Sequence, residues 1–261
     1  FYFLSKSNLI SYTKIKETNF FADNFPNISN YNSINLHTSK IINKHDLKNT
    51  FIMKKNSKFL LEGSVNNFYS KNAPQKIYTY NPSAKIILIL RDPIQRLMSH
   101  YFMDLNLGLN TKDINQSLLE ELSTGNSYGS DLGYLKMSVI TKNYENWTNF
   151  FSPKNILLIN FEDLKNQDLI KKKLKEFLFI NFDNINLNID NVGRVPRFIE
   201  FNKLIMKIRG YFPLVYKPQI LKNLYKFIFF KKNKSFDIHD NVKEKLHNYF
   251  KEDYEFLQKY F

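Results

Sequence analysis

The residues best suited to chemistry follow a short apolar run, residues 86–90, with the composition of a buried strand. Arg91 comes directly after this run, and Asp92 and Pro93 lead into a segment with helical spacing. Asp92 is a good N-cap residue and Pro93 suits the first helical position, so we expect a helix to begin immediately after Arg91. The free N–H groups at such a helix start favour an anion. An arginine fork beside them can bind a phosphate through two hydrogen bonds.

Ser99 lies on the same expected helix, less than two turns beyond its start, so its hydroxyl could join Arg91 at the anion. Arg96 precedes His100 by about one turn. An arginine at this place could equally pair with Asp92 or another nearby carboxylate, and Ser99 would then be an ordinary helix residue. The residue types and their spacing leave both interpretations open.

Strands that alternate with helices would position these residues. Three short apolar runs, residues 58–63, 85–90 and 155–160, predict buried parallel strands. Helical spacing follows between and after them, in chain order at residues 74–80, 93–105, 132–151 and 163–179. This alternation predicts an α/β fold of three layers, with a central parallel sheet and helices on both faces. Ligands of such sheets bind beyond the carboxyl ends of the strands, where Arg91 would stand.

The last part of the chain predicts helices rather than strands. Residues 198–230 and 238–260 have helical spacing, and strand signals end near residue 181. We therefore expect one domain over residues 1–261. Its α/β core would span residues 1–180, and residues 181–261 would form a mainly helical C-terminal part.

The composition narrows the classes of site and partner. The chain has 261 residues, no cysteine and a formal net charge of +14. The absence of cysteine excludes disulfides and thiolate metal sites and favours a reducing compartment, so we expect a cytoplasmic protein. The five histidines show no metal-ligand spacing, and no apolar run approaches a membrane span, so we expect no metal and no transmembrane segment. The positive charge favours an anionic partner, but the lysines are scattered and do not identify it.

A longer pattern around Arg91 resembles that of a known family. Residues 85–108 contain a hydrophobic strand, Arg-Asp-Pro, two residues, Arg, two residues and Ser, followed closely by an aromatic residue. This segment resembles the 3′-phosphate-binding segment of sulfotransferases that use 3′-phosphoadenosine 5′-phosphosulfate (PAPS). The resemblance implies that Arg91 and Ser99 hold the 3′-phosphate of the nucleotide. It also implies a fold like that of P-loop NTPases.

The stretch Lys-Glu-Thr-Asn-Phe-Phe at residues 16–21 resembles one in glycan-type and many bacterial sulfotransferases. The resemblance implies that Glu17 is the catalytic base, which takes the proton of the acceptor. The structural alternative is a carboxylate paired with Lys14 or Lys16. Among the members of this family, bacterial sulfotransferases related to heparan sulfate sulfotransferases are the most similar in character.

Further segments match the family in order along about the first 200 residues. Residues 61–85 resemble the segment that leads into the strand before Arg91, and residues 133–164 resemble a Gly-x-Tyr helix and a strand ending in Glu-Asp-Leu. Residues 191–198 are similar to a short basic loop that closes over the nucleotide. The resemblance implies that Tyr134 lines the nucleotide pocket and that Arg194 contacts its phosphate. A core tyrosine and a solvated loop arginine are the structural alternatives.

Two features depart from the family pattern. The sequence contains no Gly-x-x-x-x-Gly-Lys, and its opening residues resemble the helix that follows the family's phosphate loop. We therefore expect the loop around the 5′-phosphosulfate to lie outside this chain, and the chain alone to be inactive. In addition, Gly63 stands where heparan-type enzymes often carry a lysine, so no role of that lysine is transferred.

The expected function is the transfer of a sulfuryl group from PAPS to a hydroxyl or amine of a carbohydrate or small-molecule acceptor. The expected partners are the nucleotide co-substrate and this acceptor, without nucleic acid. One alternative is a nucleotide or small-molecule kinase on the same fold, which would need a Walker lysine and a Mg²⁺-binding acid. The other is a non-enzymatic basic module that binds glycans or nucleic acid, with salt-sensitive binding and no nucleotide preference.

Overall fold

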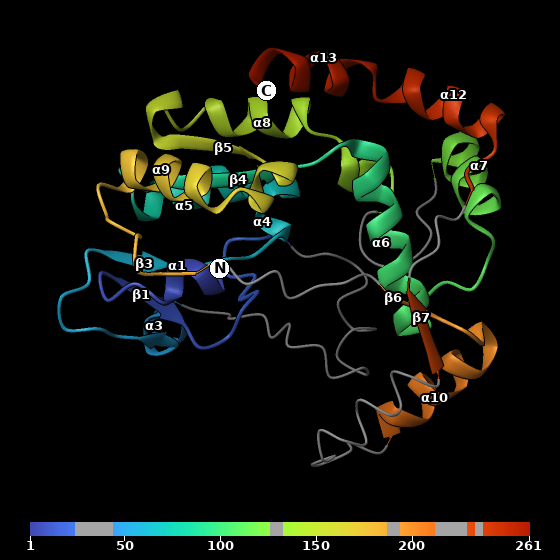
Figure 1. The fold of residues 1–261 in the computed structure, drawn as a ribbon, viewed down its shortest axis with the longest axis horizontal. Coiled ribbons are helices and arrows are strands. Elements are labelled where there is room, and N and C mark those ends of the chain that lie inside the picture. The colour runs from blue at the N-terminus through green and yellow to red at the C-terminus, as the bar shows by residue number, and fades with distance from the viewer. Residues whose placement is uncertain (24–43, 126–132, 187–193, 212–228, 233–236) are drawn as a thin grey trace.

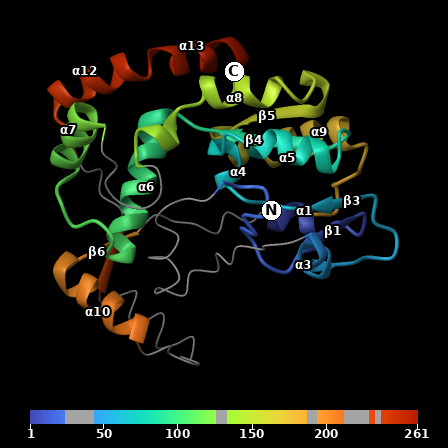
Figure 2. The ribbon, with the colours of Figure 1, turned by 180° about the vertical axis from the view of Figure 1, so that it is seen from behind.

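The computed structural model describes residues 1–23, 44–125, 133–186, 194–211, 229–232 and 237–261 (Figures 1 and 2). In chain order the strands are β1 (Ile10–Thr13), β2 (Phe51–Ile52), β3 (Phe59–Leu61), β4 (Ile86–Leu90), β5 (Ile156–Asn160), β6 (Arg194–Pro196) and β7 (Phe230–Lys232). The α-helices are α1 (Tyr2–Ser5), α3 (Lys44–Asn49), α4 (Asn66–Tyr69), α5 (Ala73–Tyr80), α6 (Pro93–Leu107), α7 (Ile114–Thr124), α8 (Thr141–Thr148), α9 (Gln167–Leu178), α10 (Ile199–Tyr211), α12 (Asp240–Tyr249) and α13 (Lys251–Tyr260). Short 3-10 helices occupy Lys136–Ser138, Pro153–Asn155 and Phe161–Lys165.

The strands of the α/β core form two sheets. β1 lies between β2, to which it is antiparallel, and β3, to which it is parallel. β4 and β5 are parallel and pair in register from Ile86 opposite Ile156 to Leu90 opposite Asn160. Among the described strands, β3 pairs only with β1 and β4 only with β5, so the predicted single sheet is divided in two. The two sheets nevertheless share one hydrophobic cluster, to which Ile10 of β1 and Ile159 of β5 both belong.

Helices cover both faces of the β4–β5 pair, as the alternation of strands and helices predicts. On one face, Leu88 packs in a cluster with Trp147 and Phe151 from α8 and its end, together with residues of α13. On the other face, Ile159 packs with Leu174 and its neighbours on α9. Figure 1 shows α8 and α13 above the two strands, while α9 overlaps β4 in this view. The three-layer arrangement fixes the carboxyl ends of both strands, where the residues of interest begin.

The three predicted strands are confirmed as β3, β4 and β5, and the helix predicted after Arg91 is confirmed as α6. The predicted burial is wrong for β3, whose Leu60 is 51% exposed. A single helix over residues 132–151 is wrong. Within the described part of this range, a 3-10 turn precedes α8, which begins only at Thr141. Hydrogen bonds to a distant acceptor explain the late start. The buried carboxylate of Asp253 accepts the backbone N–H groups of Ile140 (2.9 Å) and Thr141 (2.8 Å) and so caps the helix there.

The expectation that strands end near residue 181 is also wrong. β6 and β7 pair antiparallel, with Val195 opposite Lys231. The predicted helix over residues 238–260 is divided into α12 and α13 at the buried Phe250. No helix in the described part of the chain is long and apolar enough to cross a membrane.

Candidate active site

The local sequence holds Arg91 at the carboxyl end of β4. The carboxylate of Asp92 accepts the backbone N–H of Gln95 at 2.7 Å, which is the N-cap contact that the sequence predicts. Pro93 then begins α6. The strand thus ends and the helix begins within two residues, so Arg91 lies between the end of a strand and the positive end of a helix dipole.

The structure brings Arg91 and Ser99 together. The guanidinium donates from Nη1 to the Ser99 hydroxyl at 2.5 Å and from Nη2 to Oε1 of Gln95 at 3.2 Å. Its Nε is buried and has no hydrogen-bond partner among the described residues. A buried donor without a partner is costly, and an anion that accepts from the guanidinium edge would satisfy it. The contact with Ser99 fits the family pattern, and the phosphate itself stays a prediction.

Phe161 is a neighbour of Arg91 that the sequence analysis missed. The guanidinium carbon of Arg91 lies 4.5 Å from the centre of the Phe161 ring, close enough for a cation–π contact. Arg91 follows β4 directly, and Phe161 follows β5 directly. Because Leu90 and Asn160 are opposite each other in a parallel pair, the next residue of each strand must emerge at the same edge. This topological signal could have identified Phe161.

Glu17 lies in a backbone segment with an unusual conformation. Glu17 has φ of 61° and Asn19 has φ of 51°, both in the left-handed region that non-glycine residues seldom occupy. Oε2 of Glu17 accepts the backbone N–H of Val65 at 2.7 Å. Its Oε1 lies 3.9 Å from Nζ of Lys16. This ion pair is long and therefore weak, so pairing with a lysine is not the main contact of Glu17.

Burial raises the pKa of the Glu17 carboxyl, and the nearby carboxylate of Glu62 raises it further. The Val65 N–H and the Lys16 ammonium act in the opposite direction. A carboxylate with a raised pKa is a stronger base than an ordinary surface carboxylate. The electrostatics therefore suit the role that the resemblance implies, which stays a prediction.

Gly63 fits closely against the first residue of the chain. Its carbonyl accepts the backbone N–H of Glu17 at 3.2 Å. A Cβ added at Gly63 would lie 2.7 Å from Cδ2 of Phe1, so any side chain there would require the Phe1 ring to move. The position where heparan-type enzymes often carry a lysine is thus filled by the Phe1 ring in this structure.

Helix α4 connects the two groups of residues. At its N-terminal side, the N–H of Val65 contacts Glu17. At its other end, the guanidinium carbon of Arg96 lies 5.3 Å from the centre of the Tyr69 ring. Arg96 belongs to α6, the helix that also carries Ser99. In Figure 1, α4 lies between the sheet of β1 and β3 and the start of α6. That Glu17 and Arg91 share one cleft stays a prediction, which this arrangement supports.

The comparison with known families decides the class of the protein. A model described as the sulfotransferase domain matches residues 18–260. The chain belongs to this family. Heparan sulfate glucosamine 3-O-sulfotransferase 5 of Mus musculus is 27% identical over 177 residues, which cover 64% of this chain and 51% of that protein. Bifunctional heparan sulfate N-deacetylase/N-sulfotransferase 4 of Mus musculus is 29% identical over 128 residues, covering 47% of this chain and 15% of that protein.

This sulfotransferase-family chain thus spans about half the length of the 3-O-sulfotransferase that it matches. Its fold is similar to the crystal structure of a sulfotransferase from Alicyclobacillus acidocaldarius. The TM-score is 0.60 at 18% identity, and the match covers 86% of this chain and 83% of that one. The likeness confirms the predicted α/β fold class of the P-loop-like kind.

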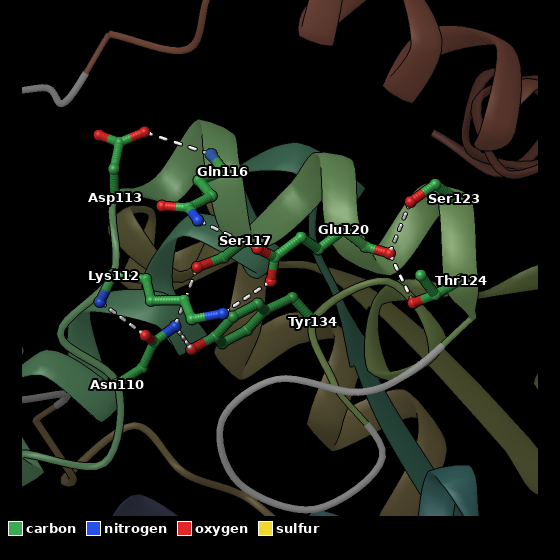
Figure 3. Close-up of polar contacts among 9 residues, drawn as sticks. All are labelled: Asn110, Lys112, Asp113, Gln116, Ser117, Glu120, Ser123, Thr124 and Tyr134. Atoms are coloured by element: carbon green, nitrogen blue, oxygen red, sulfur yellow. Dashed lines mark hydrogen bonds and ion pairs between the residues drawn. The ribbon is translucent and has the colours of Figure 1, made fainter.

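Tyr134 of this sulfotransferase domain is fully buried (0% exposed), within a polar network that its neighbours complete. Its hydroxyl donates to Oδ2 of Asp104 at 2.9 Å and accepts from Nδ2 of Asn110 at 2.9 Å. Figure 3 shows Tyr134 beside Asn110 and Ser117, below the helix that carries Glu120. This position favours the core role over direct contact with a nucleotide. Nucleotide binding by Tyr134 stays a prediction.

Arg96 and Arg194 are the other two arginines near the candidate site or predicted to belong to it. Nη1 of Arg96 lies 2.9 Å from Nδ1 of the buried His100, and burial lowers the pKa of His100 to about 3, so the ring is neutral. Arg194 lies in β6 opposite Lys232, and its contact with the nucleotide stays a prediction. Residues 191–193 of the predicted basic loop lie outside the described residues. Within the described ranges, no group of three histidine or acidic residues could hold a metal.

Proposed function

We propose that the whole protein transfers a sulfuryl group from PAPS to a hydroxyl or amine of a carbohydrate acceptor. The observation that carries this proposal is the 2.5 Å contact between Arg91 and Ser99 at the start of α6, within the segment that matches the family. Two relatives are named for transfer to heparan sulfate, one at an oxygen and one at a nitrogen. Their names support a carbohydrate as the acceptor and leave the atom open.

In this proposal, the Arg91 fork and the Ser99 hydroxyl hold the 3′-phosphate of the nucleotide. The buried Nε of Arg91, which has no partner in the described part of the chain, fits such an anion. Arg194 would add a second cation to the nucleotide phosphates. These contacts bind and orient the donor, and orientation lowers the barrier by removing the entropy cost of alignment from the reaction step.

Glu17 would take the proton of the acceptor hydroxyl or amine as the acceptor attacks the sulfur. A new bond forms between the acceptor atom and sulfur, and the bond from sulfur to the nucleotide's phosphate oxygen breaks. The products are the sulfated acceptor and 3′-phosphoadenosine 5′-phosphate, with the proton on Glu17. A positioned base of this kind contributes about 10²–10⁴-fold to the rate. The loop around the 5′-phosphosulfate stays a prediction.

The test is transfer by the full-length protein from ³⁵S-labelled PAPS to desulfated heparan-type oligosaccharides. We expect labelled product from wild type and a large loss in both Arg91→Ala and Glu17→Gln. ATP-dependent phosphorylation of a small acceptor, without sulfuryl transfer, would favour the kinase alternative. Salt-sensitive binding of heparin without any preference for the 3′-phosphorylated nucleotide would favour the non-enzymatic module.

A further inference from the structure

We propose that Glu62 positions Glu17: its carboxylate anchors the backbone of residues 17–19 and places a second negative charge beside the proposed base. This inference rests on the proposed role of Glu17. Glu62 follows β3 directly, at the carboxyl end of a strand parallel to β1. Glu17 follows β1 by four residues, so the two glutamates emerge at the same edge of their sheet.

The Glu62 carboxylate accepts hydrogen bonds from three side chains. Its Oε1 accepts from the hydroxyl of Thr18 at 2.6 Å and from the hydroxyl of Ser64. Its Oε2 accepts from Nδ2 of Asn67 at 3.0 Å. The Ser64 oxygen in turn accepts the backbone N–H of Asn19 at 2.9 Å. Glu62 thus holds Thr18 directly and Asn19 through Ser64, the two residues that follow the proposed base.

The conformation of this segment requires such anchors. Left-handed backbone is unfavourable at a residue such as Glu17, whose Cβ is crowded there, and Asn19 adopts it two residues later. Such a conformation persists only where surrounding contacts fix it. Residues 62–65 supply those contacts, since the N–H of Glu17 is bonded to Gly63 and its carboxylate to Val65. Without them, the segment would relax and the direction of the Glu17 side chain would change.

Glu62 also carries the only charge in residues 62–65. In the described part of the chain, the charged side chains that act on Glu17 are those of Lys16 and Glu62. Of these, only Glu62 is negative, and it disfavours the charged form of Glu17. The two effects of Glu62 can be separated, because a neutral residue of the same shape would keep its hydrogen bonds and remove its negative charge.

Glu62→Gln makes this separation. Gln Oε1 can still accept from Thr18 and Ser64, and its amide nitrogen would face Asn67. The Oδ1 atom of Asn67 is buried and has no partner in the described part of the chain, so a flip of this amide would let Oδ1 accept the new donor. We therefore expect the Glu62→Gln variant to fold and to retain the network while it loses one negative charge. Affinity for 3′-phosphoadenosine 5′-phosphate should stay at the wild-type value and serves as the folding control.

The readout is the pH dependence of kcat in the full-length protein. A base must be deprotonated, so activity is lost as pH falls through the pKa of Glu17. In Glu62→Gln that pKa is lower, so the acid limb should move to lower pH, and the ratio of variant to wild-type kcat should rise as pH falls. Ser64→Ala, which breaks the link to Asn19 without a change of charge, should lower kcat roughly tenfold at every pH and leave the limb in place.

An acid limb in Glu62→Gln that coincides with that of wild type would overturn this inference while the role of Glu17 stands. Full activity of Glu17→Gln would overturn the proposed base, and this inference with it. If Glu62→Gln fails to fold, Glu62→Asp supplies the second measurement. Aspartate keeps the negative charge but has a shorter side chain. We therefore expect kcat to fall while the acid limb of the pH profile stays in place. A kcat equal to that of wild type would contradict the anchoring role of Glu62.

Discussion

Replacement of Arg91 by alanine should remove the preference of the full-length protein for a 3′-phosphorylated nucleotide. Among the described residues, Arg91 has one neutral partner at each terminal nitrogen and none at its buried Nε. A phosphate would therefore gain the Nε contact and exchange at least one neutral acceptor for a charged one. A hydrogen bond between charged groups contributes about 1.5–3 kcal/mol, which corresponds to roughly 10- to 150-fold in affinity.

Titration calorimetry with 3′-phosphoadenosine 5′-phosphate and with AMP measures this preference. We expect wild type to prefer the former by about this factor, and Arg91→Ala to bind both nucleotides with similar affinity. Arg91→Lys should recover only part of the preference, because an ammonium lacks the planar fork that reaches Ser99 and Gln95 together. Lys165→Ala removes the same charge from an exposed position near the same sheet edge and should leave the preference intact. Equal binding of both nucleotides by wild type would refute the reasoning.

Three further changes test the remaining roles. Phe161→Leu removes the ring beneath the Arg91 guanidinium and should weaken 3′-phosphoadenosine 5′-phosphate binding about 2- to 5-fold in calorimetry, with AMP binding unchanged. Glu17→Gln should lower kcat about 10²- to 10⁴-fold with little change in nucleotide affinity. In the wild type, kcat should fall as the pH drops through the pKa of Glu17, which is raised above that of an ordinary glutamate. Tyr134→Phe removes a donor from the buried Asp104 and should lower the free energy of unfolding by about 1–3 kcal/mol in urea titrations. A change in nucleotide affinity without a loss of stability would instead support the pocket role of Tyr134.

The sequence predicted best what depends on neighbouring residues. The strand at residues 86–90, the cap at Asp92, the first helical residue Pro93 and the contact between Arg91 and Ser99 all lie within 14 consecutive positions. In this stretch, side-chain chemistry and helix geometry leave few alternatives, so pattern and structure agree.

The features that it missed depend on residues far apart in the chain. The helix expected from residue 132 starts late because Asp253, 113 residues away from Ile140, accepts the N–H group there. β6 and β7 are each three residues long and are stabilised as strands by pairing with each other, so neither has a clear local pattern. Phe161 could have been found from the parallel pairing of β4 and β5, by asking which residue follows the neighbouring strand.

The same contrast separates the two halves of the candidate site. Residues within one loop and the next two turns hold Arg91, whereas contacts from residues 62–65, more than 40 positions away in sequence, hold Glu17. Changes in residues 62–65 should therefore lower or alter kcat while nucleotide affinity stays constant, and only the loss of the Glu62 charge should also move the pH profile. Changes at Gln95 or Ser99 should affect nucleotide affinity instead. α4 is the element that links them, since Val65 before its first residue contacts Glu17 and Tyr69 at its end contacts Arg96 of α6. A double-mutant cycle between Ser64→Ala and Ser99→Ala measures that coupling. If α4 is rigid and the halves act independently, the two effects on kcat/KM should add to within about 0.3–0.5 kcal/mol.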